Sequence, residues 1–424
     1  MPTSSRAAYG ADRRPPLGRN RNYLLLWSGQ AVSKVGSGIS DITFPLLTLA
    51  LTGSPAKAGF VGTALALPYL ILGLPAGALI DRWDRKRVMV ICDVGRAAAL
   101  GSIPAVAAFG HITVVQLYAV AAASGTFLVF FSVAQTASLP RVVPKEQLAE
   151  ATAWNLTTSN TAGLVAPPLG GFLYQSLGKT APFLLDGVSY AVSALSLLFI
   201  SAQFQGERIA KQGNLRVEIR EGLAFLWNQP IIRSTALLNG AGTLIDAGIP
   251  LILIVLAKRE HATPLLIGIM FALGGIGGII GSTLAPRLLH RFGFRHSTVS
   301  VMWVLALLYP LYAVAPRPLL LGLVSAAVAL VAPLYITAFS SYQLTVVPDA
   351  LQGRVAGAIR ILSSVGWPLG LALTGILIQQ LGAISTMLLI SLCNVAIAVA
   401  TSTNRSIRAV PVLGGDHTPS KPKG

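Results

Sequence analysis

Long apolar segments recur along the whole chain, and they constrain the fold more than any other feature. Each is close to the roughly 20 residues that an α-helix needs to cross a bilayer. The chain of 424 residues is 53% hydrophobic and only 11% charged, whereas soluble domains carry about 25% charged residues. A sequence this apolar cannot hide its surface in one soluble core, so lipid must cover it. We therefore expect an all-α membrane protein.

Twelve transmembrane helices are expected, at residues 23–51, 56–80, 88–109, 112–136, 148–177, 181–203, 231–257, 264–289, 297–315, 318–345, 353–381 and 384–402. An internal repeat at an offset of 204 residues relates the first six to the last six. Val142-Val143-Pro144 recurs as Val346-Val347-Pro348, and Gly73 and Gly77 recur as Gly277 and Gly281. The repeat predicts two pseudo-symmetric bundles of six helices.

The repeat and the loops divide the chain into five predicted parts. They are an N-terminal tail (1–21), a first six-helix bundle (22–204), a linker (205–229), a second six-helix bundle (230–403) and a C-terminal tail (404–424). In the linker, charged residues alternate with apolar ones, as in an amphipathic helix that lies in the membrane interface. The C-terminal tail is polar and rich in proline and glycine, so we expect it to be disordered.

Lysine and arginine are distributed unevenly between the two sides of this topology. With the N-terminus in the cytoplasm, twenty-three of them fall in cytoplasmic loops and tails and five fall outside. Basic residues accumulate in the cytoplasmic loops of membrane proteins, so both tails are expected in the cytoplasm. This distribution accounts for the net charge of +17 without a nucleic-acid partner. The richness in Ala, Gly and Arg suggests a GC-rich bacterium, and hence its inner membrane.

A compact charged motif closes the second span and opens the third, and it reads Gly77-Ala-Leu-Ile-Asp81-Arg82-Trp-Asp84-Arg85-Lys86-Arg87. Charged side chains are disfavoured at the bilayer centre by about 2.5–3.5 kcal/mol each, so the motif must lie at an interface. With the twelve spans and the six-plus-six repeat, it resembles the major facilitator superfamily of secondary transporters, whose loop reads Gly-x-Leu-Ala-Asp-Arg-x-Gly-Arg-Lys. Here Asp84 replaces the second glycine, and Asp tolerates the left-handed backbone of a tight turn.

This resemblance implies a gating role for Asp81, which would hold the start of span eleven when the protein opens outward. The alternative is an ordinary interfacial charge. A second resemblance lies in span five, where exporters of the superfamily show Gly-Pro-x-x-Gly-Gly. This chain has Ala166-Pro167-Pro168-Leu169-Gly170-Gly171, preceded by Gly163.

The opening run of the first span, Asn22-Tyr-Leu-Leu-Leu-Trp27-Ser-Gly29-Gln30, resembles the drug:proton antiporter branch that includes macrolide and siderophore exporters. The resemblance implies export of small amphipathic compounds, drug-like or natural products, by proton antiport and alternating access. The alternatives are a dedicated exporter of one siderophore or natural product, an importer, and a membrane scaffold or sensor that transports nothing.

Ionisable residues inside the predicted spans are candidate functional residues because each is costly in the membrane. Asp41 in span one is the candidate for proton coupling; the alternatives are a structural role or a pair with Lys34, which could instead extend toward the cytoplasm. Ser37 stands where relatives of this branch often carry an acid. Gln30 and Asn155 either line a substrate cavity or bridge helices.

Asp93 and Arg96 lie three residues apart in span three, on one face of the helix, and we expect them to form an intramembrane ion pair. The alternative is a gate whose pairing changes with the open side. Asp186 and Asp246 are expected to be structural, and the sequence leaves the role of Arg360 open.

No metal-ligand spacing or cofactor motif occurs in the sequence, and the five histidines are scattered in loops and the C-terminal tail. We therefore expect no enzymatic activity, no metal and no cofactor. The expected partners are a small-molecule substrate, protons and the lipid bilayer, and the chain is expected to act as a monomer.

Overall fold

The computed structural model describes residues 16–202, 204–205, 215–315 and 317–408, and every regular element within these ranges is helical. The first half contains six long helices: α1 (Arg21–Thr52), α2 (Pro55–Ile80), α3 (Arg85–Phe109), α4 (Val114–Val142), α5 (Leu148–Ser176) and α6 (Ala181–Leu198). The short 3₁₀ helices η1 (Leu17–Arg19) and η2 (Lys145–Gln147) precede α1 and α5. Most of both predicted tails lies outside the described residues.

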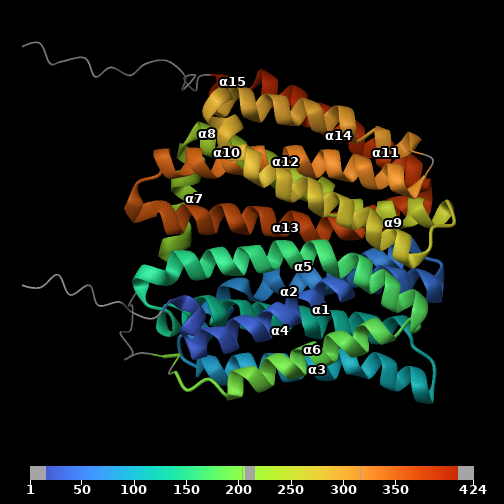
Figure 1. Ribbon diagram of the computed structural model, residues 1–424. Coiled ribbons are helices and arrows are strands. Elements are labelled where there is room, and N and C mark those ends of the chain that lie inside the picture. Colours follow the sequence, from blue (N-terminus) through green and yellow to red (C-terminus); the bar gives the residue numbers. More distant parts are fainter. Residues whose placement is uncertain (1–15, 203, 206–214, 316, 409–424) are drawn as a thin grey trace, which may run out of the picture.

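The second half repeats this plan with more interruptions. It contains α8 (Pro230–Asp246), α9 (Ile249–Arg259), α10 (Pro264–Leu308), α11 (Leu311–Val314), α12 (Pro318–Val346), α13 (Asp349–Leu381), α14 (Ala383–Thr403) and α15 (Arg405–Arg408). Figure 1 shows the two halves as separate bundles, with α1–α6 in its lower part and α8–α14 in its upper part. In the first bundle α2 packs on α4 and α3 on α6, and in the second α10 packs on both α12 and α14.

The helices agree with the predicted spans, and the all-α fold is confirmed. Ten helical stretches of the described residues are long and apolar enough to cross a membrane. One of them, Pro264–Val314, contains two predicted spans. Within it, α10 consists of two helical segments that meet at a kink at Gly293, whose φ of 69° is not helical. Helix α5 corresponds to the remaining predicted span, and its first half is rich in polar residues.

A helix, α7 (Leu215–Asn228), lies in the predicted linker. It packs on α13 and α8, and Leu226 is almost completely buried there. Glu221 of α7 forms an ion pair with Arg354 near the start of α13. The linker helix therefore contacts the second half of the chain at the end of the bundle where α13 begins.

The two halves meet mainly through two helix pairs, α5 with α10 and α2 with α13, and α9 makes smaller contacts with α1 and α2. We call the end of the molecule at which α1 begins and α14 ends the terminal face, and the other end the distal face. At the distal face these pairs are in backbone contact: a Cβ added at Gly171 would overlap the carbonyl oxygen of Pro264, and one at Gly59 would overlap Leu371 and Gly375. Small residues permit such close approach in membranes.

Hydrogen bonds reinforce this distal closure. The hydroxyl of Ser54 donates to Gln379 Oε1 at 2.9 Å, and the hydroxyl of Thr63 donates to the carbonyl oxygen of Pro368 at 3.0 Å. Both bonds join α2 to α13. The distal face is thus closed by contacts from both halves.

The same two helices are apart toward the terminal face. A Cβ added at Gly73 or Gly77 of α2, or at Gly353 or Gly357 of α13, would meet nothing within 4 Å among the described residues. The close glycine contacts between α2 and α13 therefore lie toward the distal face. The structure is closed at the distal face and open toward the terminal face.

Replacing Gly171 by Ala should open the distal face. The added methyl group overlaps the Pro264 backbone, and overpacking of this kind costs about 1–3 kcal/mol, enough to change a two-state equilibrium about tenfold. In a chain whose only cysteine is Ala58→Cys, a membrane-impermeant thiol reagent added on the distal side should react about tenfold faster in the Gly171→Ala variant.

Gly101→Ala is the matched control, because a Cβ there meets nothing within 4 Å of the described residues. Equal labelling rates in the wild type, the control and the Gly171→Ala variant would show that this contact does not hold the distal face closed.

Candidate functional site

A cavity of about 710 Å³ lies between the two halves. Its walls come from α1, α2 and α4 of the first half and from α8, α9 and α13 of the second. Most of the lining is apolar, and aromatic side chains come from both halves: Phe44, Tyr69 and Trp367. Among the described lining residues, the charged ones are Asp41 and Arg360. The cavity has the size and the character of a site for a small amphipathic molecule.

Asp41 reaches this cavity from α1, and its side chain is exposed there. Pro45 follows one turn later within the helix and also lines the cavity. The neighbours of Asp41 in the sequence, Ser40 and Ile42, are buried in the first half. Helical periodicity therefore presents one carboxyl group to the cavity while the adjoining residues hold α1 in place.

Lys34 does not pair with Asp41, since no ion pair joins them in the described part of the chain. Its Nζ atom donates to the carbonyl oxygen of Asn155 at 3.2 Å and to the hydroxyl of Ser159 at 2.9 Å. Lys34 thus ties α1 to α5, and Asn155 contributes its backbone to this contact. Gln30 accepts a hydrogen bond from Gln135 and so bridges α1 and α4.

A buried polar network occupies the interior of the first half, and sequence reasoning assigned its central residue, Asp186, only a structural role. Asp186 is 1% exposed. It accepts hydrogen bonds from the hydroxyls of Ser40 and, at 3.2 Å, of Ser189. A Cβ at Gly36 would overlap Asp186 and Ser189, so α1 needs this glycine to meet α6. Asp186 therefore lies next to the helical turn that carries Asp41.

Arg96 and Tyr190 extend the network. The guanidinium carbon of Arg96 lies 3.9 Å from the centre of the Tyr190 ring, which is the geometry of a cation–π interaction. The Tyr190 hydroxyl is hydrogen-bonded to that of Ser37. The polar network therefore joins α1, α3 and α6, and it gives Ser37 a place beside Tyr190 on α6.

The predicted ion pair between Asp93 and Arg96 is not among the contacts of the described residues. Both residues are buried, but no salt bridge joins them among the described residues, and neither carboxyl oxygen of Asp93 has a hydrogen-bond partner there. The spacing of three places both side chains on one face of α3, as expected. The Tyr190 ring of α6, however, takes the guanidinium group, and sequence spacing within α3 gives no information about it.

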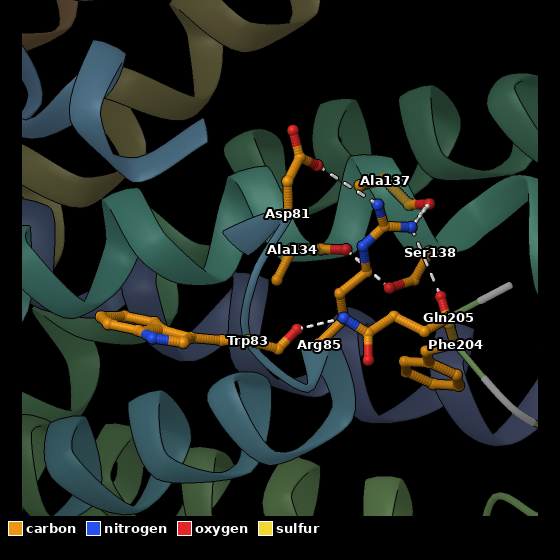
Figure 2. A network of polar contacts seen from close by, with 8 residues as sticks. All are labelled: Asp81, Trp83, Arg85, Ala134, Ala137, Ser138, Phe204 and Gln205. Atoms are coloured by element: carbon orange, nitrogen blue, oxygen red, sulfur yellow. Dashed lines mark hydrogen bonds and ion pairs between the residues drawn. The ribbon is translucent and has the colours of Figure 1, made fainter. Parts of the chain in front are cut away.

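The gating motif lies at the terminal face, between α2 and α3 (Figure 2). Arg85 donates to the carbonyl oxygens of Ala137 at 2.8 Å and of Phe204 at 3.4 Å, and it forms an ion pair with Asp81 at 3.4 Å. Lys86 donates to the carbonyl oxygens of Leu198 and Ile200. Arg85 and Lys86 thus bind backbone carbonyl oxygens of α4, of the end of α6 and of the segment after α6, while the Asp81 side chain is 74% exposed.

Asp84 does not take the left-handed turn that its place in the motif suggested. Its φ of −69° and ψ of 111° are extended, and its side chain accepts a hydrogen bond from the backbone N–H of Arg87 at 2.8 Å. Asp84 is therefore the N-cap of α3, a position that Asp favours. Arg82, between Asp81 and Trp83, is exposed.

The exporter-type motif of α5 supplies contacts in two directions. Gly170 packs against the backbone of Ile39 in α1, and Gly171 packs against Pro264 in α10. Gly268 of α10 packs closely against the backbone of Pro167. A Cβ at Gly163, in contrast, would meet no described atom within 4 Å. The motif therefore packs α5 between the two halves at the distal face.

Arg360 is the cavity residue to which the sequence assigned no role. The residues of α13 that line the cavity are Arg360, Ser364, Trp367, Pro368 and Leu371. Their spacing of three and four residues is that of one helix face. This periodicity is visible in the sequence, but which face of α13 meets the cavity depends on the packing of α13 against α2 and α8.

A helical membrane protein with two six-helix halves and an apolar cavity between them has the architecture of a secondary transporter. The sequence profile of the Major Facilitator Superfamily matches residues 26–371. The chain belongs to this superfamily.

Two relatives are named as efflux proteins. The multidrug efflux pump Tap of Mycolicibacterium fortuitum is 27% identical over 387 residues, which cover 87% of this chain and 92% of Tap. The macrolide efflux protein A of Streptococcus pyogenes is 24% identical, over 91% of this chain and 96% of that protein. The resemblance to the branch that includes macrolide exporters is thereby confirmed.

A solved structure supports the fold independently. The nucleoside transporter NupG superposes with a TM-score of 0.75, at 15% sequence identity, over 90% of this chain and 99% of that chain. At this identity the likeness shows the shared architecture of the two proteins.

Replacing Ser40 by Ala should destabilise the first half, because Asp186 loses one of its two hydroxyl donors. A lost hydrogen bond to a buried charged group costs about 1–3 kcal/mol. We expect a lower midpoint of thermal unfolding for the purified variant in detergent, followed by intrinsic fluorescence.

Ser28→Ala is the matched control on the same helix, because Ser28 is exposed and its hydroxyl bonds, among the described residues, only the carbonyl oxygen of Leu25. If the Ser40→Ala variant were as stable as this control, the hydrogen bond from Ser40 to Asp186 would not stabilise the first half.

Proposed function

We propose that this protein exports small amphipathic organic compounds, drug-like or natural products, across the cytoplasmic membrane in exchange for protons. The observation that carries the proposal is the cavity itself: it is largely apolar, is closed at the distal face and exposes one carboxyl group, that of Asp41. The similarity to a multidrug efflux pump, Tap, and to macrolide efflux protein A supports both the outward direction of transport and the substrate class.

The excess of basic residues in the loops of the terminal face supports a cytoplasmic position for that face. The structure is then an inward-open state, which would take up substrate from the cytoplasm or the inner leaflet. Opening to the outside requires the distal contacts of Gly171 and Gly59 to break and the terminal ends of α2 and α13 to meet. The open glycines at those ends, Gly77 and Gly353 among them, leave room for that approach.

Asp41 provides a simple basis for proton exchange. A single carboxyl group can hold either a proton or the cationic group of a substrate, and each excludes the other. Arrival of a proton from outside would release the substrate, and departure of the proton to the cytoplasm would prepare the next cycle. The hydroxyl of the adjoining residue, Ser40, bonds Asp186, so the buried network lies one residue away from the exchanging carboxyl group.

Replacing Asp41 by Asn should abolish the dependence of export on the proton gradient. In bacteria that lack their own efflux pumps, the wild type should lower the accumulation of dyes and antibiotics that carry a basic group, and a protonophore should restore it. The Asp41→Asn variant should reduce export about tenfold or more, the effect of one lost contact with a charged group.

Glu260→Gln, which neutralises an exposed carboxyl group between α9 and α10, should export like the wild type. Export that survives in the Asp41→Asn variant and remains sensitive to the protonophore would move proton coupling to another acid, of which Asp186 is the nearest candidate. No difference between the wild type and empty cells for any compound would overturn the exporter proposal.

Asp81 should act only in the outward-open state. In the inward-open structure its carboxyl group is exposed and held by Arg85 alone among the described residues. Closure of the terminal face would bring it to the N-terminus of α13, where the helix dipole favours a negative charge by about 0.3–1 kcal/mol or more. Asp81→Asn should therefore reduce export while leaving thermal stability unchanged.

The distance between spin labels at Arg141 and Thr345, at the terminal ends of α4 and α12, reports this closure. We expect the wild type to populate both a long and a short distance, and Asp81→Asn to populate mainly the long one. Glu150→Gln neutralises another exposed carboxyl group of the same face and is the control. An unchanged distance distribution in Asp81→Asn would show that Asp81 is an ordinary interfacial charge.

A further inference from the structure

The cavity carries two opposite charges, and they come from different halves of the protein. Asp41 belongs to α1 and Arg360 to α13, and both side chains are exposed to the cavity. No ion pair joins these two residues in the described part of the chain. A cavity that held only apolar compounds would require neither charge, and one that held only cations would require Asp41 but not Arg360.

Arg360 lies deep in the membrane-spanning part of the protein. It follows the first residue of α13 by eleven positions, a rise of about 16 Å along the helix axis. Arginine at such depth is costly and faces a protein interior or an aqueous pathway. We therefore expect Arg360 either to pair with another group of the protein or to have a role in function.

Three other arginines within the helices have partners among the described residues. Arg96 lies on the Tyr190 ring, Arg85 binds backbone carbonyl oxygens and Arg354 pairs with Glu221. Arg360 has neither a hydrogen bond nor an ion pair to any residue that the structure describes. Its guanidinium group is thus exposed in the cavity without an acceptor from the described protein.

An unpartnered guanidinium group discriminates among ligands. A neutral ligand that displaces water from it leaves a buried charge without compensation, and a purely cationic ligand is repelled by it. A carboxylate or another anionic group, in contrast, matches the planar donors of arginine. Among amphiphiles of equal size, the cavity should therefore prefer those with an anionic group.

We propose that the substrates are zwitterionic amphiphiles, which carry a basic group and an acidic group on an apolar or aromatic body. Arg360 binds the acidic group from the second half, and Asp41 binds the basic group from the first half. Trp367 lies two turns after Arg360 on the same face of α13 and is 45% exposed, so it offers an aromatic surface to the ligand between the charges. The inference rests on the proposed export function.

Binding across the two halves also gives the ligand a place in the transport cycle. Each half supplies one charge, so a zwitterion contacts both halves at once, whereas a cation contacts mainly the first half. A volume of about 710 Å³ is within the roughly 300–1,000 Å³ of sites for drug-sized molecules, large enough for one ligand to span the cavity.

Two matched dyes test the proposal. A rhodamine with a free carboxyl group is a zwitterion, and the ethyl ester of the same dye is a cation of nearly equal size and shape. Uptake of each dye into inside-out membrane vesicles is measured after an acid-inside proton gradient is imposed, with vesicles from empty cells as background. The wild type should transport the free acid about tenfold faster than the ester, as expected for one contact with a charged group.

Arg360→Gln should reverse this preference: transport of the free acid falls about tenfold, and transport of the ester rises because the repulsion is gone. Arg360→Lys, which keeps the charge, should still prefer the free acid. Arg317→Gln removes an exposed arginine before α12, outside the cavity lining, and should behave like the wild type. Ester transport by Arg360→Gln also shows that the variant is folded.

The possible outcomes separate this inference from the proposed function. Transport of the ester alone, or of both dyes equally and without change in Arg360→Gln, would overturn the zwitterion preference and leave the exporter standing. Transport of neither dye by the wild type would overturn the inference for this dye class, and the accumulation assay above would then decide the exporter separately. If Arg360→Gln transports neither dye, loss of the free-acid preference in Arg360→Lys would still contradict the inference.

Discussion

Backbone contact between helices at glycines is the interaction on which the arrangement of the two halves depends. Lipid provides little hydrophobic force between helices, so close packing and hydrogen bonds must hold them together. At the distal face, Gly171 and Gly268 join α5 to α10, and Gly59 and Gly375 join α2 to α13. Because these contacts lie at one end of the helices only, the other ends are free to separate. The same glycine contacts therefore account for the closed distal face and for the cavity between the separated ends.

The cost of charge in the membrane then decides where polar residues lie, and the two halves solve the problem differently. The offset of 204 residues maps Asp41 onto Ile245, next to Asp246. Asp246 accepts a hydrogen bond from the Tyr309 hydroxyl at 2.7 Å, whereas Asp41 is exposed to the cavity. The first half also contains the network around Asp186. The two halves thus share one topology but differ in their charges. The first half contains the buried acids, and the second half contributes a guanidinium group to the cavity.

Most of the fold could be predicted because each span is a local property of the chain, and α5 matches its predicted range within one residue. The site could be predicted only in part. The motif around Asp81 was visible because its chemistry is contiguous in sequence, and Asp41 was visible because an acid inside a span is rare. The contact of the Arg96 guanidinium group with Tyr190 could not be predicted, because Tyr190 comes from another helix. Asp186 was undervalued because its donor Ser40 is 146 residues away.

The sequence by itself determined that lipid is the solvent, where the chain crosses it, that six spans are repeated, and which loops carry the basic residues. These follow from hydropathy, period and local charge, which need no knowledge of neighbours. Only the tertiary structure decided which face of each helix meets the cavity, which acids are exposed and which face is closed. The physical reason is that a helix presents polar residues on several faces, and only the packing of other helices against it selects the one that remains open to a ligand.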